Sequence, residues 1–298
     1  MLCVALPYCP KGQNEAGRGR MILTLSRDVY YRDPALFGSQ AVVNRYVDSI
    51  AYTLNVPRAM LHVTAAAKGL VAGTFNICRR DGSIVHAVNE KEGMLVPMLK
   101  EILSIDMAAV KWILVIEKEA SFRSIIASSF CDRIFTEGII MTGKGYPDVA
   151  TRALLRFMAT PSPQNGFASP PIFCLVDYDP DGMAIMSTYK NGSAALTHEN
   201  EDLRVPQMQW LGLRSDAFGR VTDKLHGEQG LLTLTPRDRQ KAVSMLARQD
   251  PASDEHELEV RNALQVMLML NTKAELQLLD ASPRGMEDLL ASALSDVE

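Results

Sequence analysis

The sequence predicts an α/β protein, α+β overall, in which a small helical module precedes a layer of parallel strands. Three observations predict this fold class. Residues 40–54 show the periodicity of an amphipathic helix, and the pair Asp81-Gly82 marks a tight hairpin turn. Farther along, three short apolar runs alternate with helical stretches, an order typical of parallel strands joined by helices.

The N-terminal module is defined by the order of its elements. The helix over 40–54 repeats apolar side chains every three or four residues, at Val42, Val43, Tyr46, Ile50 and Leu54. Pro57 suits the first turn of a second helix that runs to about Ala67. Two strand-like segments then flank residues 80–83, where Asp-Gly favours a hairpin. Helix, helix and hairpin follow one another in winged-helix domains, which commonly lay a helix against duplex DNA.

The middle of the chain predicts the sheet. WILVI, residues 112–116, is a continuous apolar run of the kind found in strands buried on both faces. A helix is expected next, then a strand over 138–141, a second helix, and a third strand over 172–176. The two helices cover about 120–129 and about 147–159. Two more helices, over 235–249 and 256–279, are expected to pack at the end of this layer.

Composition limits the class of protein. The 298 residues are 47% hydrophobic and 22% charged, which is typical of a folded globular chain. The longest uncharged stretch, residues 157–176, is broken by four prolines, and we therefore expect no membrane span. With a net charge of −4, the chain is not a generic polycation. Binding to nucleic acid would need a local basic face or a partner.

Cysteine and histidine give no metal or disulfide pattern. The five cysteines never form CxxC, which favours a reducing intracellular compartment, and the five histidines are dispersed. The N-terminal apolar stretch has no preceding basic region, so we do not expect a signal peptide. Residues 1–20 are expected to form a loose tail.

Three acidic residues follow predicted strands. Glu117 ends the first strand, and Asp177 and Asp179 follow the third. Groups at the carboxyl ends of parallel strands gather at one edge, and oxygen ligands without nearby His or Cys favour Mg²⁺. Alternatively, Asp-Pro-Asp-Gly is a helix cap and Glu117 pairs with Lys118 or Arg123. Either motif alone fits that structural alternative, whereas the two together favour a metal site.

Two adjacent tyrosines lie in an unusually polar segment, SRDVYYRDP, residues 26–34. A tyrosine can act as a nucleophile when a cation stabilises its phenolate, because its free pKa is about 10. Alternatively, one ring packs in the core and the other lies on the surface. The residues alone favour this second interpretation.

Two Lys-Gly pairs, Lys68-Gly69 and Lys144-Gly145, could approach a phosphate closely. Neither lies in a Walker A loop, and each also fits an ordinary turn.

Taken together, the motifs resemble a known family. RDVYY, HVTAAAKGLVAG, VIEKEASF, TGKGYPD, LVDYDPDG and VPQMQWLGL occur in the order and spacing of the A subunit of topoisomerase VI and its eukaryotic relative, which makes programmed meiotic double-strand breaks. The resemblance implies a partial winged-helix, catabolite-activator-like domain over 21–92. A Toprim Rossmann-like domain with a C-terminal helical extension would then cover 93–298.

The resemblance also implies the site. Tyr31 would be the nucleophile, with Arg27 beside it to hold the scissile phosphate or neutralise the phenolate. The metal ligands would be Glu117, Asp177 and Asp179, and the ion Mg²⁺. Asp181 lies outside this set and is expected to be structural. DNA-binding residues would include Lys68, Lys144 and Tyr146.

The implied reaction is a reversible transesterification that leaves a 5′-phosphotyrosyl link on duplex DNA. The implied partners, in the nucleus, are double-stranded DNA, a second copy of the chain, other meiotic break-forming proteins and a topoisomerase VI B-like subunit. The segment before Tyr31 is shorter than in the family, so the N-terminal domain is expected to lack part of its cover. A truncated, non-catalytic DNA-binding or scaffold form is therefore one alternative. Another is a Toprim hydrolase or primase-type enzyme with structural tyrosines.

Overall fold

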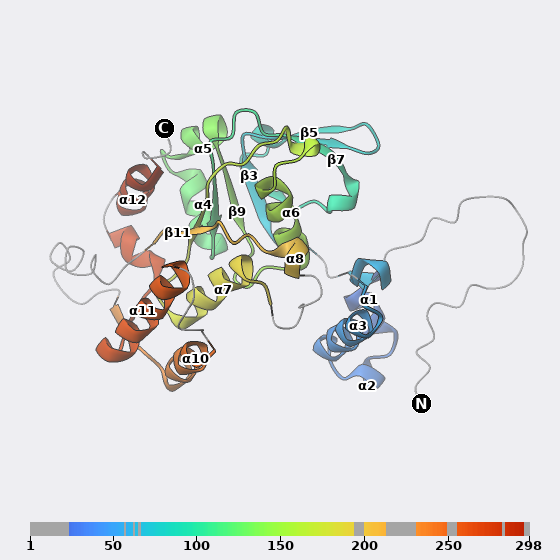
Figure 1. Ribbon diagram of the computed structural model, residues 1–298. Coiled ribbons are helices and arrows are strands. Elements are labelled where there is room, and N and C mark those ends of the chain that lie inside the picture. Colours follow the sequence, from blue (N-terminus) through green and yellow to red (C-terminus); the bar gives the residue numbers. More distant parts are fainter. Residues whose placement is uncertain are drawn as a thin grey trace, which may run out of the picture.

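The computed structural model shows a group of N-terminal helices beside a larger body built on a sheet (Figure 1). The structure describes residues 24–56, 58–61, 63–64, 67–193, 200–212, 231–248, 255–281 and 284–294. Residues 1–20, which are expected to form a loose tail, lie outside the described residues.

In its described residues, the N-terminal unit consists of three α-helices, one 3-10 helix and one pair of short parallel strands. Its elements are β1 (Thr24–Leu25), α1 (Ser26–Arg32), α2 (Pro34–Phe37), α3 (Gln40–Leu54), the 3-10 helix η1 (Arg58–Leu61) and β2 (Val63–Thr64). The helix expected over 40–54 is confirmed with the same bounds. The helix expected from Pro57 to Ala67 is wrong, because Val63 and Thr64 instead pair with β1. Two consecutive β-branched residues favour that extended conformation.

The buried face of α3 differs from the one expected. Val43, Val47 and Ala51 are buried, whereas Tyr46, Ile50 and Leu54 are exposed by 56%, 37% and 59% of their surface. Val43, Val47 and Ala51 are four residues apart, so they form one stripe along the helix. α1, α2 and η1 all contact α3, while the larger apolar side chains Tyr46, Ile50 and Leu54 point to solvent.

The body is built on a six-stranded sheet in the order β11-β10-β8-β9-β3-β6. The strands expected over 112–116, 138–141 and 172–176 are confirmed as β8, β9 and β10, and β8 pairs in parallel with both others. β3 is antiparallel to β9 and to β6. The bounds are β3 Leu70–Gly73, β6 Met94–Leu95, β8 Trp112–Ile116, β9 Gly138–Thr142, β10 Ile172–Leu175 and β11 Gln209–Trp210.

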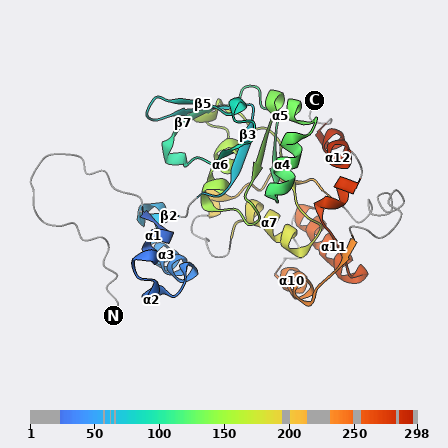
Figure 2. The ribbon, with the colours of Figure 1, turned by 180° about the vertical axis from the view of Figure 1, so that it is seen from behind.

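Helices cover both faces of this sheet. α4 (Glu119–Ala127) and α5 (Cys131–Glu137) lie on one face, and α6 (Val149–Ala159) and α7 (Pro180–Lys190) on the other (Figures 1 and 2). Right-handed crossovers give this arrangement, because the chain steps one way from β8 to β9 and back from β9 to β10. All five residues of β8 are buried, as expected for a strand covered on both faces.

The expected hairpin is confirmed, but it belongs to the sheet body. β4 (Asn76–Arg79) and β5 (Ile84–His86) form a three-stranded antiparallel sheet with β7 (Ile102–Asp106). β3 meanwhile joins the six-stranded sheet. Strand pairing therefore crosses the boundary expected between residues 92 and 93, and the change from helical unit to sheet body comes before Leu70. Short 3-10 helices connect these parts, namely η2 Ala87–Asn89, η3 Leu99–Glu101 and η4 Pro163–Asn165.

The C-terminal region contains one strand, β13, that the sequence pattern did not predict. The helix expected over 235–249 is confirmed as α10 (Pro236–Leu246). The one expected over 256–279 is too long: α11 ends at Leu270, Asn271 has a positive φ of 52°, and a strand follows. The elements are α8 Asn200–Leu203, β12 Leu231–Thr233, α11 Glu255–Leu270, β13 Thr272–Ala274, η6 Leu276–Ala281 and α12 Gly285–Leu294. No described helix has the length and apolar character needed to cross a bilayer.

Candidate active site

Two carboxylates meet where neighbouring strands end. Glu117 follows β8 and Asp177 follows β10 by two residues, and these strands pair in parallel. The Glu117 amide donates to the Leu175 carbonyl (3.0 Å), and Glu117 Oε2 accepts from the Asp177 amide (3.0 Å). Sheet pairing therefore fixes the two residues against each other, at the edge where α/β enzymes place their catalytic groups.

Asp179 has a structural role that the sequence also suggested. It is the N-cap of α7, and its Oδ1 accepts from the Gly182 amide at 2.7 Å. Pro180 occupies the first helical position, where its missing N–H costs nothing. A Cβ at Gly182 would overlap the Asp177 carbonyl, so only glycine fits there. The helix-cap alternative for Asp-Pro-Asp-Gly is thus confirmed for Asp179, which still presents its second carboxylate oxygen.

The acids of this edge repel one another. Burial, together with the Asp177 and Asp179 carboxylates, raises the pKa of Glu117 to about 7. Burial also raises the pKa of Asp179. A divalent cation would relieve this repulsion, and carboxylate oxygens are the donors that Mg²⁺ prefers. Donor chemistry and strand-end placement therefore fit the ion. Among the described residues, no three carboxylate, imidazole or thiol side chains converge as a ready-made group of ligands.

The lysine next to Glu117 pairs with a different acid from the one expected. Lys118 Nζ lies 2.7 Å from Asp177 Oδ2, and Arg123 forms its ion pair with Glu119 at 3.1 Å. The alternative in which Glu117 pairs with Lys118 or Arg123 is therefore wrong, because Lys118 turns to Asp177 and Arg123 to Glu119, one turn earlier on α4.

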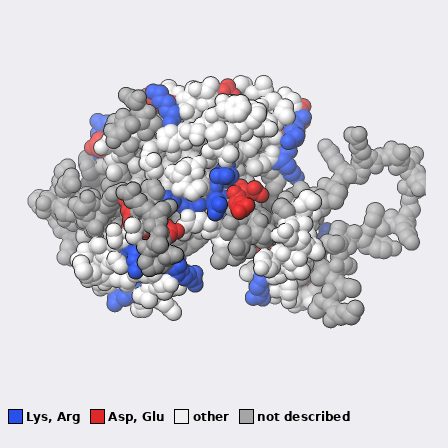
Figure 3. Space-filling view, viewed as in Figure 1, with Lys and Arg blue, Asp and Glu red and all other residues white. Residues whose placement is uncertain are grey.

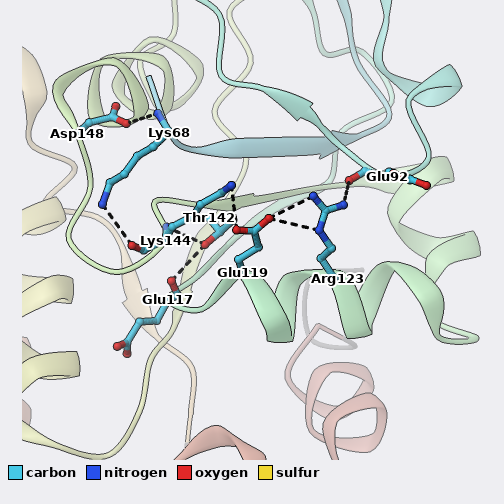
Figure 4. Close-up of polar contacts among 8 residues, drawn as sticks. All are labelled: Lys68, Glu92, Glu117, Glu119, Arg123, Thr142, Lys144 and Asp148. Carbon is cyan, nitrogen blue, oxygen red and sulfur yellow. Dashed lines mark hydrogen bonds and ion pairs between the residues drawn. The ribbon is translucent and has the colours of Figure 1, made fainter. Parts of the chain in front are cut away.

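The two Lys-Gly segments lie side by side (Figure 4). Lys68 Nζ donates to the Lys144 carbonyl at 3.2 Å, and the Lys68 amide donates to Asp148 Oδ2 at 2.8 Å. Lys144 Nζ forms an ion pair with Glu119 at 2.9 Å. Lys144 has a positive φ of 53°, which turns the chain sharply after β9. Residues 76 positions apart in sequence thus form one basic cluster beside the end of β8.

Tyr146 belongs to a separate cluster. Its hydroxyl accepts from Lys241 Nζ at 2.5 Å and lies 3.2 Å from Asp181 Oδ1. Lys241 also pairs with Asp181. Burial raises the pKa of Tyr146 although Lys241 opposes the shift. Asp181 therefore forms an ion pair with Lys241 and accepts a hydrogen bond from Tyr146, and its structural role stays a prediction.

Tyr31 and Arg27 lie on α1, in the N-terminal unit. They are four residues apart, so both occupy one face of the helix. Tyr31 is 66% exposed, whereas the neighbouring Tyr30 is half-buried, and their ring centroids are 5.2 Å apart. Within the described residues, no hydrogen bond or ion pair links Tyr31 or Arg27 to the strand-end acids, which lie on the separate sheet body (Figure 1).

Surface charge is mixed around these groups. Figure 3 shows basic side chains in several separate places on one face, with acidic side chains beside those near its centre. The described residues of this face form no continuous basic surface. This mixture of charges is consistent with the net charge of −4.

Lys241 and Glu275 were missed by reasoning from the sequence. Each reaches the site through a tertiary contact with a residue at least 60 positions away, and neither lies in a motif. Lys118, by contrast, is next to Glu117 in the sequence, and this adjacency was the signal that could place it near the acids.

Comparisons with known proteins agree with the motifs. Residues 112–289 match the family model of the TOP6A-Spo11 Toprim domain, and residues 15–63 match the model of type IIB DNA topoisomerase. A meiotic recombination protein SPO11 of Mus musculus is 36% identical over 74% of this chain and 54% of its own. The Homo sapiens protein of that name is 34% identical over 85% of this chain and 61% of its own.

Two further relatives widen the range. The meiotic recombination protein rec12 of Schizosaccharomyces pombe is 35% identical over 90% of this chain and 70% of its own. DNA topoisomerase 6 subunit A3 of Oryza sativa subsp. indica is 31% identical over 88% of this chain and 56% of its own. The chain thus spans less than two thirds of the mouse and human relatives. The strand-end acids, the fold of the body and these matches agree: the chain belongs to the TOP6A-Spo11 family.

Proposed function

We propose that this chain is a Mg²⁺-dependent DNA transesterase that forms the programmed double-strand breaks initiating meiotic recombination. The observation that carries the proposal is the exposed Tyr31, one helical turn after Arg27, in a chain whose Toprim body presents acids at the ends of β8 and β10. Relatives named as meiotic recombination proteins support the meiotic role, and with it a place on chromosomes in the nucleus.

Tyr31 is the nucleophile in this proposal. Its phenolic oxygen attacks a backbone phosphorus of duplex DNA, the 3′-oxygen leaves with a proton, and a 5′-phosphotyrosyl ester remains. One ester replaces another, so no water is consumed and the step is reversible. Arg27 lies on the same helical face and can donate hydrogen bonds to the scissile phosphate. Because Tyr30 is half-buried, its ring serves to pack α1.

Glu117, Asp177 and Asp179 would hold the Mg²⁺ ion. When bound, the ion supplies positive charge that offsets charge on the phosphoryl oxygens. Lys68 and Lys144 would contact the DNA backbone from the basic cluster beside β8, and Tyr146 from the neighbouring loop. Both lysines are held by a hydrogen bond or an ion pair within the chain, so DNA would meet a preformed surface.

A complete site requires two copies of the chain in this proposal. Tyr31 and the acids lie on separate parts of one chain, so the tyrosine of one protomer can serve the acids of its partner. Two such sites would cut both strands of a duplex. Since the net charge of −4 disfavours strong autonomous DNA binding, other break-forming proteins and a topoisomerase VI B-like subunit would help to load the dimer.

Recovery of covalently attached DNA tests the proposal. A tagged chain is purified under denaturing conditions from meiotic cells of its source organism, trimmed with nuclease and end-labelled. We expect label on the wild type and on Tyr30→Phe, and none on Tyr31→Phe. Label retained by Tyr31→Phe would exclude Tyr31 as nucleophile. Broken DNA with protein-free ends would instead indicate a hydrolase.

One observation favours a second candidate, a non-catalytic DNA-binding or scaffold form. Tyr46, Ile50 and Leu54 expose a row of apolar side chains on α3, which a protein partner would cover. This candidate predicts no covalent DNA on any variant, together with normal association of the chain with meiotic chromosomes.

A further inference from the structure

A distant segment of the chain runs along the loop that carries Asp177 and Asp179. The Tyr178 amide donates to the Ala274 carbonyl (2.8 Å), and the Ala274 amide donates to the Tyr178 carbonyl (3.0 Å). These two bonds form an antiparallel bridge between residues almost a hundred positions apart. The segment 273–277 therefore fixes the backbone between the two aspartates.

The same segment also binds the Asp177 side chain. Asp177 Oδ1 accepts from the Leu276 amide (2.9 Å), and Oδ2 accepts from Lys118 Nζ (2.7 Å). The carboxylate is only 5% exposed, so water cannot easily replace either donor. Each oxygen keeps a second lone pair, which leaves Asp177 able to bind a cation in this orientation.

Lys118 is itself fully engaged. Besides Asp177, its ammonium contacts Glu275 Oε2 (3.2 Å) and Gln277 Oε1 (3.1 Å). An ammonium group has three N–H donors, so these three acceptors account for all of them. Lys118 thereby joins the end of β8 to the segment 273–277 and to Asp177 at once.

The segment is anchored at its other end as well. Lys273 Nζ forms an ion pair with Asp238 Oδ2 at 2.8 Å. Asp238 is part of a capping box with Thr235 at the start of α10. The segment is therefore held between α10 and β8, and its position is determined by elements outside the acid-bearing loop.

We propose that Lys118 and residues 273–277 form a clamp that orients the Asp177 carboxylate for a divalent cation, with Lys118 as a positioning residue. The proposal rests on the metal-binding role proposed above for Asp177. A clamp of this kind makes the C-terminal region necessary for the metal site although it supplies no ligand. Groups that orient a metal ligand in this way commonly change metal affinity about 10–100-fold when removed.

The direction of one effect separates a clamp from a simple counter-charge. If Lys118 acted only through its positive charge, replacing it with methionine would strengthen cation binding, because a repulsive charge is lost. If Lys118 orients Asp177, the same replacement weakens binding in spite of the lost repulsion. Methionine has nearly the length of the lysine stem and preserves its packing.

Mn²⁺ binding to the purified full chain, followed by electron paramagnetic resonance, makes this distinction. We expect Lys118→Met to weaken Mn²⁺ binding roughly tenfold or more. Lys118→Arg keeps a cationic donor and should recover most of the affinity. The control is Lys111→Met, which removes a lysine that pairs with Glu137 at the opposite end of β8, and its affinity should match the wild type. Equal or tighter binding by Lys118→Met overturns the proposal.

Hydrogen exchange in metal-free protein tests the clamp independently of the metal. We expect the Leu276 amide to exchange faster in Lys118→Met than in wild type or Lys111→Met, because its acceptor loses orientation. Unchanged exchange at Leu276 shows that no clamp operates. If wild-type protein binds no Mn²⁺, the metal role of Asp177 and the positioning role of Lys118 both fail, whereas faster exchange would still establish the contact network.

Discussion

Replacing Asp148 with alanine should destabilise the protein through two separate hydrogen bonds. Asp148 Oδ1 accepts from the Thr151 amide (2.8 Å) and so caps α6, while Oδ2 accepts from the Lys68 amide (2.8 Å). One carboxylate therefore ties the start of α6 to the segment before β3. Figure 4 shows this link beside the basic cluster formed by Lys68 and Lys144.

The magnitude follows from these two bonds. Loss of a helix N-cap costs about 1 kcal/mol. A hydrogen bond to a charged acceptor contributes roughly 1.5–3 kcal/mol, and the lower figure applies here because Lys68 is exposed and water can reach its amide. We therefore expect Asp148→Ala to lower the free energy of unfolding by roughly 2–3 kcal/mol. Urea denaturation followed by circular dichroism measures this change.

A second cap provides the matched control. Asp33 caps α2 through the Leu36 amide at 2.9 Å and makes no second bond of this kind to a described residue, so Asp33→Ala should cost only about 1 kcal/mol. Asp148→Asn keeps the preferred capping chemistry but not the charge. Its free energy of unfolding should lie between those of Asp148→Ala and the wild type. If Asp148→Ala loses no more than Asp33→Ala, the link between Asp148 and Lys68 contributes nothing and the reasoning is wrong.

Three further predictions concern the body of the protein. Gly138→Ala places a Cβ against the buried Trp112 ring and should cost about 1–3 kcal/mol in urea denaturation. Burial raises the pKa of Asp238, but hydrogen bonds from Lys273 and Thr235 and the Lys273 charge together outweigh burial, so the net shift is downward. These contacts stabilise the fold above the ordinary aspartate pKa and lose that effect as pH falls, so Asp238→Asn should flatten the decline in unfolding free energy between about pH 5 and 3. Leu114→Ala opens a cavity in β8 and should cost about 2–5 kcal/mol, and a smaller loss would show that the sheet collapses around it.

The sequence was sufficient for the elements whose pattern is local. WILVI predicted β8 because an apolar run of five residues suits a strand covered on both faces, and Asp81-Gly82 predicted the hairpin because its turn needs no distant contact. The acids at the ends of β8 and β10 were also predictable, since strand order brings Glu117 and Asp177 to one edge.

The rest depended on contacts between distant residues. Asn271, which ends α11 with a positive φ, is a local stop signal, but apolar side chains continue at helical spacing beyond it and mask that signal. β13 forms because it pairs with β12. The side of α3 that is buried depends on α1. In the site, the Lys118 ammonium contacts Asp177, Glu275 and Gln277 together, and the last two residues are more than 150 positions away in the sequence.

The most direct test of the central claim is to locate the covalent DNA remnant on the chain. Trypsin cuts after Arg27 and Arg32, so both tyrosines fall in the peptide DVYYR, and fragmentation by tandem mass spectrometry assigns the attached nucleotide to one of them. The account predicts a 5′-phosphate linked to Tyr31. A nucleotide on Tyr30, or broken DNA with no adduct on this peptide, would contradict it.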